Sequence, residues 1–264
     1  MCHDVQVTDW TRFESLVLEG AAEPTQGWDF SWLDGRATEG RPSWKYLENL
    51  GTRMARASAV LDLQTGGGEL FAQVLGRSVE RPQFLAATES WLPNIEVARR
   101  NLHPFGVTVV HTPDEGAVPF EDESFELVCS RHPTVVVWKE IERLLRPGGI
   151  YFSQQIGAGT NSELANFFVA PRELPENQKM QRMISRATEV GLKVLDAREE
   201  SLPVAFFDIG AVVYFLRKVI WTVPDFSVDK YHDRLRDLHE RIERDGSFTS
   251  HSQRIILEVE KRIS

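Results

Sequence analysis

The chain has 264 residues, of which 42% are hydrophobic and 26% charged, and its formal net charge is −9. These values are ordinary for a soluble globular protein with one large domain, or one domain with an insertion. The acidic balance gives no overall electrostatic footprint for nucleic acid. No apolar stretch approaches the ~20 residues of a membrane span, and the N-terminus lacks the basic and apolar run of a signal peptide.

The two cysteines, Cys2 and Cys129, have neither the spacing of a metal site nor that of a disulfide framework. Because Cys129 falls inside a predicted strand, we interpret it as a small buried hydrophobic residue and not as a nucleophile. We therefore predict a cytoplasmic protein that holds no metal ion.

The first 40 residues are rich in Trp, Gly and acidic residues and predict irregular structure. Pro42 suits the first turn of a helix that runs to about residue 58. Beyond it, short apolar segments alternate with helical ones, which is typical of right-handed βαβ crossovers and a parallel sheet. The expected strands are 59–63, 84–88, 107–111, 126–129 and 150–153, and the expected helices are 69–76, 94–102 and a segment through 140–145 that Pro147-Gly148-Gly149 stops.

The last third of the chain predicts a different arrangement. A helix over 176–189 and a strand over 193–205 precede two helical segments, expected at 208–220 and 228–245, and a final strand covers 254–260. The second helical segment carries an apolar stripe at helical spacing, formed by Tyr231, Leu235, Leu238 and Ile242. We expect this helical pair to be inserted between the sixth and seventh strands and to cap the site.

The predicted fold class is therefore α/β, a Rossmann-like sheet of seven mostly parallel strands with helices on both faces and a helical cap inserted between strands six and seven. In this organisation residues 1–58 cover the cofactor site and 59–207 form the core. Residues 208–253 form the cap, and 254–264 return to the core as its last strand.

The most informative segment covers residues 59–70. An apolar strand leads to Asp62, the turn Gln64-Thr65-Gly66-Gly67-Gly68 follows, and Glu69 opens a helix. A strand buried on both faces is apolar throughout, glycines let a ligand approach without meeting a Cβ atom, and the helix presents unpaired N–H groups. The order predicts the entry to a nucleotide-type cofactor site, although a structural glycine turn would explain the loop alone.

Glu89 ends the second predicted strand, 23 positions after Gly66. An acid at about this spacing accepts hydrogen bonds from the ribose hydroxyls of a bound nucleoside. The alternative is a solvated loop carboxylate.

Four ordered motifs between about 59 and 155 resemble those of class I S-adenosylmethionine (SAM) dependent methyltransferases. Asp62, Gly66 and Gly68 match the family's D-x-G-x-G-x-G, whereas Gln64 stands where the family has its first glycine. Glu89 provides the second motif. Residues 114–128 are similar to D-A-x-x-L-P-F-x-D-x-S-F-D-x-V, and residues 140–149 are similar to E-x-x-R-V-L-K-P-G-G.

Within this family the chain resembles the type 11 group of small-molecule and quinone methyltransferases, and in particular a bacterial subgroup. The resemblance implies SAM as the cofactor and S-adenosylhomocysteine (SAH) as the product. It also places Asp114 where a carboxylate accepts a hydrogen bond from the adenine amino group. The predicted cofactor-binding residues are Asp62, Gln64, Thr65, Gly66, Gly68, Glu69, Glu89, Ser90, Asp114, Glu115, Ser130, Arg131 and Tyr46.

His132 is the candidate catalytic residue, because it follows the fourth strand and an imidazole titrates near neutrality. It is predicted to act as a base or to bind the acceptor, and a structural histidine held by Pro133 is an equal alternative. Gln154, Gln155 and Asn161 are candidates for the acceptor pocket, or for amides that tie loops together. Aromatic residues that are predicted either to cover the sulfonium or to pack in the core are Trp28, Trp44 and Tyr46.

The leading hypothesis is a SAM-dependent methyltransferase that acts on a small molecule by aligning it with the methyl group. Aromatic residues over 206–226 suit an apolar acceptor under the cap, but a sheet cover or a homodimer interface explains them equally. A ribosomal or transfer RNA methyltransferase is a second hypothesis, supported by the excess of arginine over lysine and opposed by the acidic charge. A third, motivated by Gln64, is a SAM-binding protein without transferase activity.

Overall fold

The computed structural model describes residues 10–25, 30–78 and 80–263, and the chain divides into two compact units. Unit 1 comprises Met1–Arg41, Gly159–Leu174 and Ser201–Gln253, and unit 2 comprises Pro42–Ala158, Pro175–Glu200 and Arg254–Ser264. Two long strands, β7 (Leu192–Phe206) and β8 (Phe248–Lys261), contribute residues to both units.

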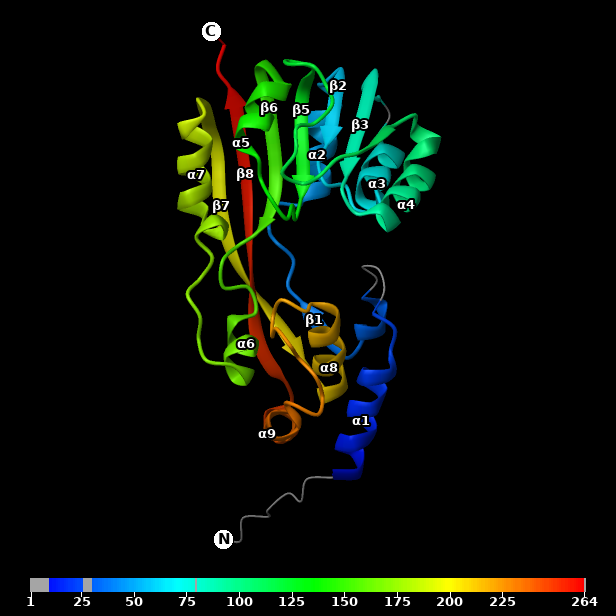
Figure 1. Ribbon diagram of the computed structural model, residues 1–264, viewed down its shortest axis with the longest axis vertical. Coiled ribbons are helices and arrows are strands. Elements are labelled where there is room, and N and C mark those ends of the chain that lie inside the picture. Colours follow the sequence, from blue (N-terminus) through cyan, green and yellow to red (C-terminus); the bar gives the residue numbers. More distant parts are fainter. Residues whose placement is uncertain (1–9, 26–29, 79, 264) are drawn as a thin grey trace. The chain divides into compact units, whose positions relative to one another are not determined.

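Unit 2 is built around the strand order β7-β8-β6-β5-β2-β3-β4 (Figure 1). Neighbouring strands from β4 to β6 are parallel, whereas β8 runs antiparallel to β6. Crossovers between parallel strands need an intervening helix, which explains why helices and strands alternate here along the chain. The strands are β2 (Ala59–Asp62), β3 (Phe84–Glu89), β4 (Thr108–His111), β5 (Phe125–Arg131) and β6 (Leu145–Ile156).

Helices cover both faces of this sheet. One face packs on α2 (Tyr46–Met54), α3 (Glu69–Arg77) and α4 (Leu92–Leu102), and the other packs on α5 (Trp138–Leu144) and α7 (Met180–Glu189). Side chains alternate between the two faces of a strand, so Leu127 and Cys129 of β5 pack in the first cluster and Val128 packs in the second. The Rossmann-like α/β class with helices on both faces is confirmed.

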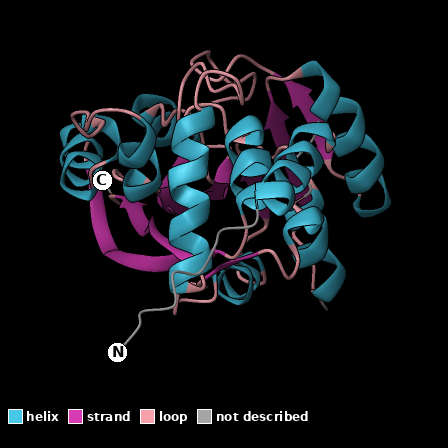
Figure 2. Cartoon of the chain, turned by 90° about the horizontal axis from the view of Figure 1, so that it is seen from below, coloured by secondary structure: helices cyan, strands magenta, loops and turns pink. Residues whose placement is uncertain are grey.

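Unit 1 buries its own apolar core between four helices and a short sheet. The helices are α1 (Trp10–Ala22), α6 (Ser162–Phe168), α8 (Ile209–Lys218) and α9 (His232–Asp245), and β1 (Ala37–Glu39) pairs antiparallel with β7. Helix, strand and loop segments are distinguished by colour in Figure 2. Representative fully buried residues of this core are Phe13, Leu164, Val212 and Leu238.

Several predicted elements need correction. The first 40 residues are not irregular throughout, because α1 and β1 form there, and β1 makes the sheet eight-stranded instead of seven-stranded. Helix α5 ends at Leu144, and Pro147-Gly148-Gly149 lies inside β6 at a register shift opposite β5, so these residues do not stop the helix. The last strand begins at Phe248, six residues before the predicted 254.

The inserted helices α8 and α9 lie between β7 and β8 in the chain, as predicted. Their proposed role as a cap stays a prediction. Three short 3-10 helices, at Ser31–Leu33, His103–Phe105 and Glu176–Gln178, complete the helical elements of the described residues. Within those residues, none of the helices has the length and apolar character needed to cross a membrane.

Candidate active site

The candidate site lies in unit 2, where the carboxyl ends of parallel strands meet. In the register of the sheet, Asp62 of β2 is opposite both Ala87 of β3 and Cys129 of β5. The residues that follow these strands therefore converge at one edge, which is where open α/β sheets bind ligands.

The glycine loop between β2 and α3 uses two glycines for different reasons. Gly66 has φ of +64°, and a Cβ atom placed on it would meet nothing within 4 Å, so its outer side is open. Gly68 precedes the first residue of α3 at φ of +75°, and a Cβ atom there would lie 2.8 Å from Leu102 of α4. Gly66 thus leaves room for a ligand, whereas Gly68 lets two helices pack closely.

Glu89 ties this loop to the end of β3. Its Oε2 atom accepts a hydrogen bond from the Gly66 backbone N–H at 2.8 Å, and its Oε1 atom accepts from Ser90 and Trp91 at 3.0 and 2.9 Å. The residue is only 6% exposed, so it is not the solvated loop carboxylate of the alternative hypothesis. A carboxylate has about four acceptor positions, and three are filled, which leaves one on Oε2.

Asp62 is buried at the end of β2. It accepts hydrogen bonds from the Thr65 hydroxyl at 2.7 Å and from the Cys129 thiol at 3.4 Å. Burial raises the pKa of Asp62 to about 6, and these two donors oppose part of that shift. Burial and the neighbouring Asp62 charge also raise the pKa of the Cys129 thiol well above its usual value, which disfavours a nucleophilic thiolate.

The side chain of Gln64 is directed away from the glycine loop and toward the segment after β5. Its Nε2 atom donates to the Val135 carbonyl oxygen at 2.6 Å, and its Oε1 atom accepts from the Thr134 backbone N–H at 2.7 Å. The backbone of Gln64 has φ of +56°, a left-handed conformation that favours glycine. The residue that departs from the family motif therefore acts as a clamp between two loops.

Thr134 extends this clamp to a third loop. Its hydroxyl lies 2.9 Å from Gln64 Oε1 and 2.7 Å from Asp114 Oδ2, so its single proton is available to one of them at a time. A narrow pocket of about 20 Å³, room for roughly one water molecule, lies beside Gln64, Asp114 and Pro133. The sequence analysis did not predict a role for Thr134. The one feature that could have indicated it is Gln64, which replaces a motif glycine and contacts Thr134.

Tyr46 of α2 and Ser130 of β5 are buried beneath the edge of the sheet where the site lies. The Tyr46 hydroxyl donates to the Ser130 carbonyl oxygen at 2.9 Å, and its ring stacks on Phe152 with centroids 5.2 Å apart. The Ser130 hydroxyl lies 2.7 Å from the hydroxyl of Tyr151, whose pKa is raised to about 12 by burial. Their polar atoms thus already have protein partners, and a cofactor role for either stays a prediction.

The other predicted residues are placed as follows. Glu69, Glu115 and Arg131 are exposed, and Thr65 and Ser90 are partly buried at the same edge of unit 2. Asn161 belongs to unit 1, whereas Gln154 and Gln155 belong to unit 2, and their role in an acceptor pocket stays a prediction. Trp28 lies outside the described residues.

His132 follows β5 and is held by Gln154 of β6. Its backbone N–H donates to the Gln154 carbonyl oxygen at 2.7 Å, and its Nε2 atom lies 3.1 Å from Gln154 Nε2. The other end of the Gln154 amide accepts from the Trp44 indole N–H at 2.8 Å. Burial lowers the pKa of His132 well below its usual value, and the charges of Arg131 and Arg254 lower it further.

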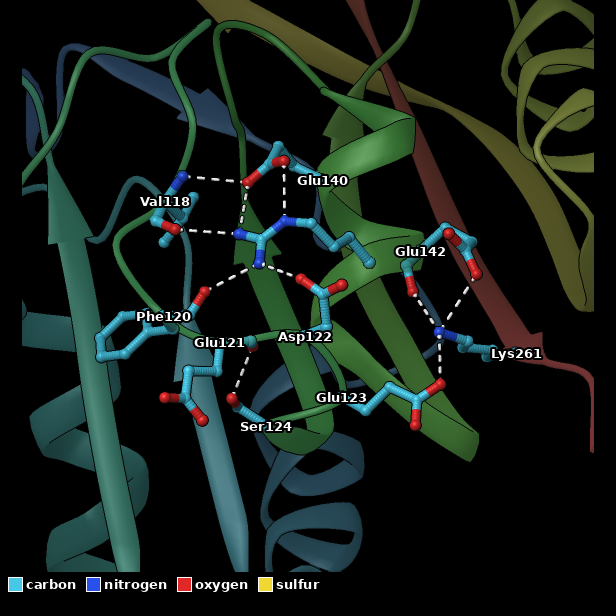
Figure 3. A network of polar contacts seen from close by, with 10 residues as sticks. Val118, Phe120, Glu121, Asp122, Glu123, Ser124, Glu140, Glu142 and Lys261 are labelled. Atoms are coloured by element: carbon cyan, nitrogen blue, oxygen red, sulfur yellow. Dashed lines mark hydrogen bonds and ion pairs between the residues drawn. The ribbon is translucent and has the colours of Figure 1, made fainter.

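Arg143 of α5 holds the loop between β4 and β5. Its partners Val118, Phe120, Asp122 and Glu140 are labelled in Figure 3. Its guanidinium contacts both carboxylate oxygens of Glu140 at 3.0 and 2.8 Å, and Asp122 at 2.7 Å. It also donates to the carbonyl oxygens of Phe120 and Val118 at 2.8 and 2.9 Å. Hydrogen bonding to Arg143 lowers the pKa of Glu140. Glu140 and Arg143, three residues apart on α5, therefore fix the loop that begins near Asp114.

Among the residues that the structure describes, no group of three or more His, Cys, Asp and Glu side chains is arranged to hold a metal ion.

Comparison with known proteins identifies one family domain in the chain and several solved structures with a similar fold. The family model described as "Methyltransferase domain" matches residues 61–153. The YcgJ protein from Bacillus subtilis is similar in fold, with a TM-score of 0.58 and 16% identity over 83% of this chain and 99% of that chain. The 4+2 cyclase SpnF has a TM-score of 0.52 and 15% identity over 96% of this chain and 93% of that one.

A third similar structure is geranyl diphosphate C-methyltransferase from Streptomyces coelicolor A3(2), with a TM-score of 0.50 and 14% identity over 81% of this chain and 78% of that chain. No curated protein matches the sequence. Residues 61–153 thus form a methyltransferase domain on the fold of class I enzymes.

Proposed function

We propose that this protein transfers the methyl group of SAM to a small-molecule acceptor. The observation that carries the proposal is the contact between Glu89 and Gly66. It joins the acid at the end of β3 to the open glycine of the loop after β2, and the Oε2 atom of Glu89 keeps one acceptor position. A nucleoside needs both features, because its ribose hydroxyls donate hydrogen bonds and its bulk requires a backbone without a Cβ atom.

The remaining cofactor contacts follow from the same edge of the sheet. Asp114 is partly buried in the loop after β4 and provides a carboxylate for the adenine amino group. The backbone N–H groups at the start of α3 favour a negatively charged group of the cofactor. Gln64 does not crowd this space, because its side chain is bound to Thr134 and Val135.

The reaction needs little chemistry from the protein. An electron pair of the acceptor forms a bond to the methyl carbon, and the electron pair of the sulfur–methyl bond returns to sulfur, which becomes the neutral thioether of SAH. The leaving group is cationic and already activated, so rate enhancement comes mainly from holding the acceptor about 3 Å from the methyl group and in line with it. The rigid ends of β5 and β6, where His132 and Gln154 lie, provide such positioning.

The similar structures support a small molecule as the acceptor. The Streptomyces coelicolor enzyme is described in complex with geranyl diphosphate and SAH. The same architecture is also present in the 4+2 cyclase SpnF, so fold alone does not define the chemistry. The net charge of −9 opposes an RNA acceptor.

Calorimetric titration with SAM and with SAH tests the proposal. We expect micromolar binding of both ligands, and about 10–100-fold weaker binding in Glu89→Gln, because a charged hydrogen-bond acceptor is lost. Glu96→Gln is the matched control, since the Glu96 carboxylate is 76% exposed and forms a surface ion pair with Arg99. Absence of binding to the wild-type protein would overturn the proposed function. If both ligands bind, transfer from labelled SAM to a panel of acceptors identifies the substrate.

A further inference from the structure

The side chain of His132 has a defined protonation state that follows from its neighbours. Trp44 is buried, and its indole N–H can only donate a hydrogen bond. This N–H lies 2.8 Å from one end of the Gln154 amide, which must therefore be the oxygen. A flipped amide would set two donors against each other and leave a buried N–H without a partner. The nitrogen of Gln154 consequently faces His132.

The next contact fixes the histidine tautomer. Gln154 Nε2 carries only donor hydrogens, and it lies 3.1 Å from His132 Nε2. His132 Nε2 therefore accepts this hydrogen bond and carries no proton, so the neutral ring has its proton on Nδ1. The charged groups that act on the ring are Arg131 at the end of β5 and Arg254 on β8, and both disfavour an imidazolium.

This arrangement is unsuited to a general base. The lone pair of Nε2 is already engaged with Gln154, and Nδ1 has no lone pair while it carries the proton. The left-handed backbone of His132, at φ of +56°, and the bond from its N–H to the Gln154 carbonyl hold the ring in place. Within the described part of the chain, Nδ1 makes no hydrogen bond, so its N–H is available to a ligand.

We propose that His132 donates its Nδ1–H to an oxygen of the methyl acceptor, and that the site selects acceptors with an anionic oxygen such as a carboxylate. The inference rests on the proposed function, because it assigns the acceptor side of the same site. The positive charges of Arg131 and Arg254, which disfavour an imidazolium, favour a negatively charged ligand at the same place. The oxygen bound by His132 is distinct from the nucleophile, which supplies its own electron pair, and no proton passes through the imidazole.

The tautomer is tested in the uncomplexed protein by nitrogen-15 NMR of the histidine side chains. We expect His132 to show a protonated Nδ1 and an unprotonated Nε2, and to titrate well below the usual histidine pKa. A protonated Nε2, or titration near the usual histidine pKa, would overturn the inference. Gln154→Glu is the informative variant, because a carboxylate can only accept and would move the proton to Nε2 or make the ring an imidazolium.

The acceptor contact is tested by titrating the SAH-saturated protein with benzoate as a carboxylate probe and benzyl alcohol as its neutral counterpart. We expect benzoate to shift the Nδ1 resonance of His132 and benzyl alcohol to leave it unchanged. His132→Ala should weaken benzoate binding about 10-fold or more. His132→Asn should retain most of it, because asparagine keeps a donor near Nδ1 and tolerates the left-handed backbone. His103→Ala, in an exposed turn of the same unit, is the control.

The outcomes separate this inference from the proposed function. If SAH does not bind, the methyltransferase proposal fails, while the tautomer measurement needs no ligand and still stands or falls alone. If SAH binds but benzoate causes no change at His132, the carboxylate-selecting site is overturned. Equal loss of benzoate binding in His132→Asn and His132→Ala would also refute the donor role.

Discussion

Replacing Gln64 by glycine restores the residue that the methyltransferase motif has at this position, yet we expect the variant to be less stable and to bind SAM no better. The side chain makes two hydrogen bonds, to the Val135 carbonyl oxygen at 2.6 Å and from the Thr134 backbone N–H at 2.7 Å, and it shares the proton of the Thr134 hydroxyl with Asp114. Each of the two full hydrogen bonds contributes about 0.5–1.5 kcal/mol and the shared one contributes less, so their loss costs about 1–4 kcal/mol. The lower end applies because Thr134 is exposed.

Two backbone effects act on the same variant. A non-glycine residue in the left-handed region costs about 1–2 kcal/mol, which Gln64→Gly recovers. Glycine also gains entropy in the unfolded chain, which offsets about 0.5–1 kcal/mol of this recovery. The net destabilisation is therefore about 1–3 kcal/mol. Gln64→Ala loses the same hydrogen bonds and keeps the strain, so it should be about 1 kcal/mol less stable than Gln64→Gly.

Urea unfolding of both variants measures the global effect, and hydrogen exchange of the Thr134 amide measures the local one. We expect the protection of this amide to fall in both variants, because its acceptor on Gln64 is gone. Calorimetry with SAM completes the comparison, with binding equal to or weaker than that of the wild type.

Two results would refute this reasoning. A Gln64→Gly variant more stable than the wild type would show that the clamp contributes nothing. An affinity for SAM that rises 10-fold or more would show that Gln64 crowds the cofactor, and would support the hypothesis of a degenerate, non-transferring site.

Three further changes test the surrounding structure. Gly66→Ala should cost about 1–2 kcal/mol of stability and mainly weaken SAM binding. Gly68→Ala should cost about 2–5 kcal/mol, because its Cβ atom would meet Leu102. Thermal unfolding measures the loss of stability in each variant, and calorimetry measures the loss of SAM binding. Because the pKa of Asp62 is raised in the folded protein, the wild type loses stability as pH rises from about 4 to 6. The free energy of unfolding of Asp62→Asn, measured with urea and compared with that of the wild type, should therefore increase by about 2–3 kcal/mol between pH ~4 and ~7.5. A difference between the two proteins that does not change with pH would contradict the raised pKa. Arg143→Lys should destabilise by about 1–3 kcal/mol because an ammonium cannot reproduce the two-oxygen contact with Glu140, and unchanged stability would refute the role of this network.

The sequence predicted unit 2 well because its strands are continuous apolar runs separated by helices. Leu61 and Val128 pack on one face of the sheet and Val60 and Leu127 on the other, and a strand buried on both faces leaves a clear pattern in the sequence. The sequence also singled out the glycine loop and Glu89, which a hydrogen bond joins in the structure, and their role in binding a cofactor stays a prediction.

The N-terminal elements escaped prediction for a physical reason. Helix α1 has only Phe13, Val17 and Gly20 buried, so its apolar stripe is narrow. Strand β1 has three residues and depends on its antiparallel pairing with β7, which is distant in sequence. Elements of this kind are stabilised by tertiary contacts, and local propensity alone does not define them.

The loop after β5 shows why family motifs locate a site without describing how it works. Residues 132–135 of this loop match no family sequence motif. They nevertheless form hydrogen bonds to three other segments: to β6 through Gln154, to the glycine loop through Gln64, and to the loop after β4 through Asp114. A loop that is ordered before a ligand arrives loses less conformational entropy on binding. Variants that cut these ties should therefore weaken ligand binding even where the altered side chain never touches the ligand, and Gln64 and Gln154 are the positions where this consequence is measurable.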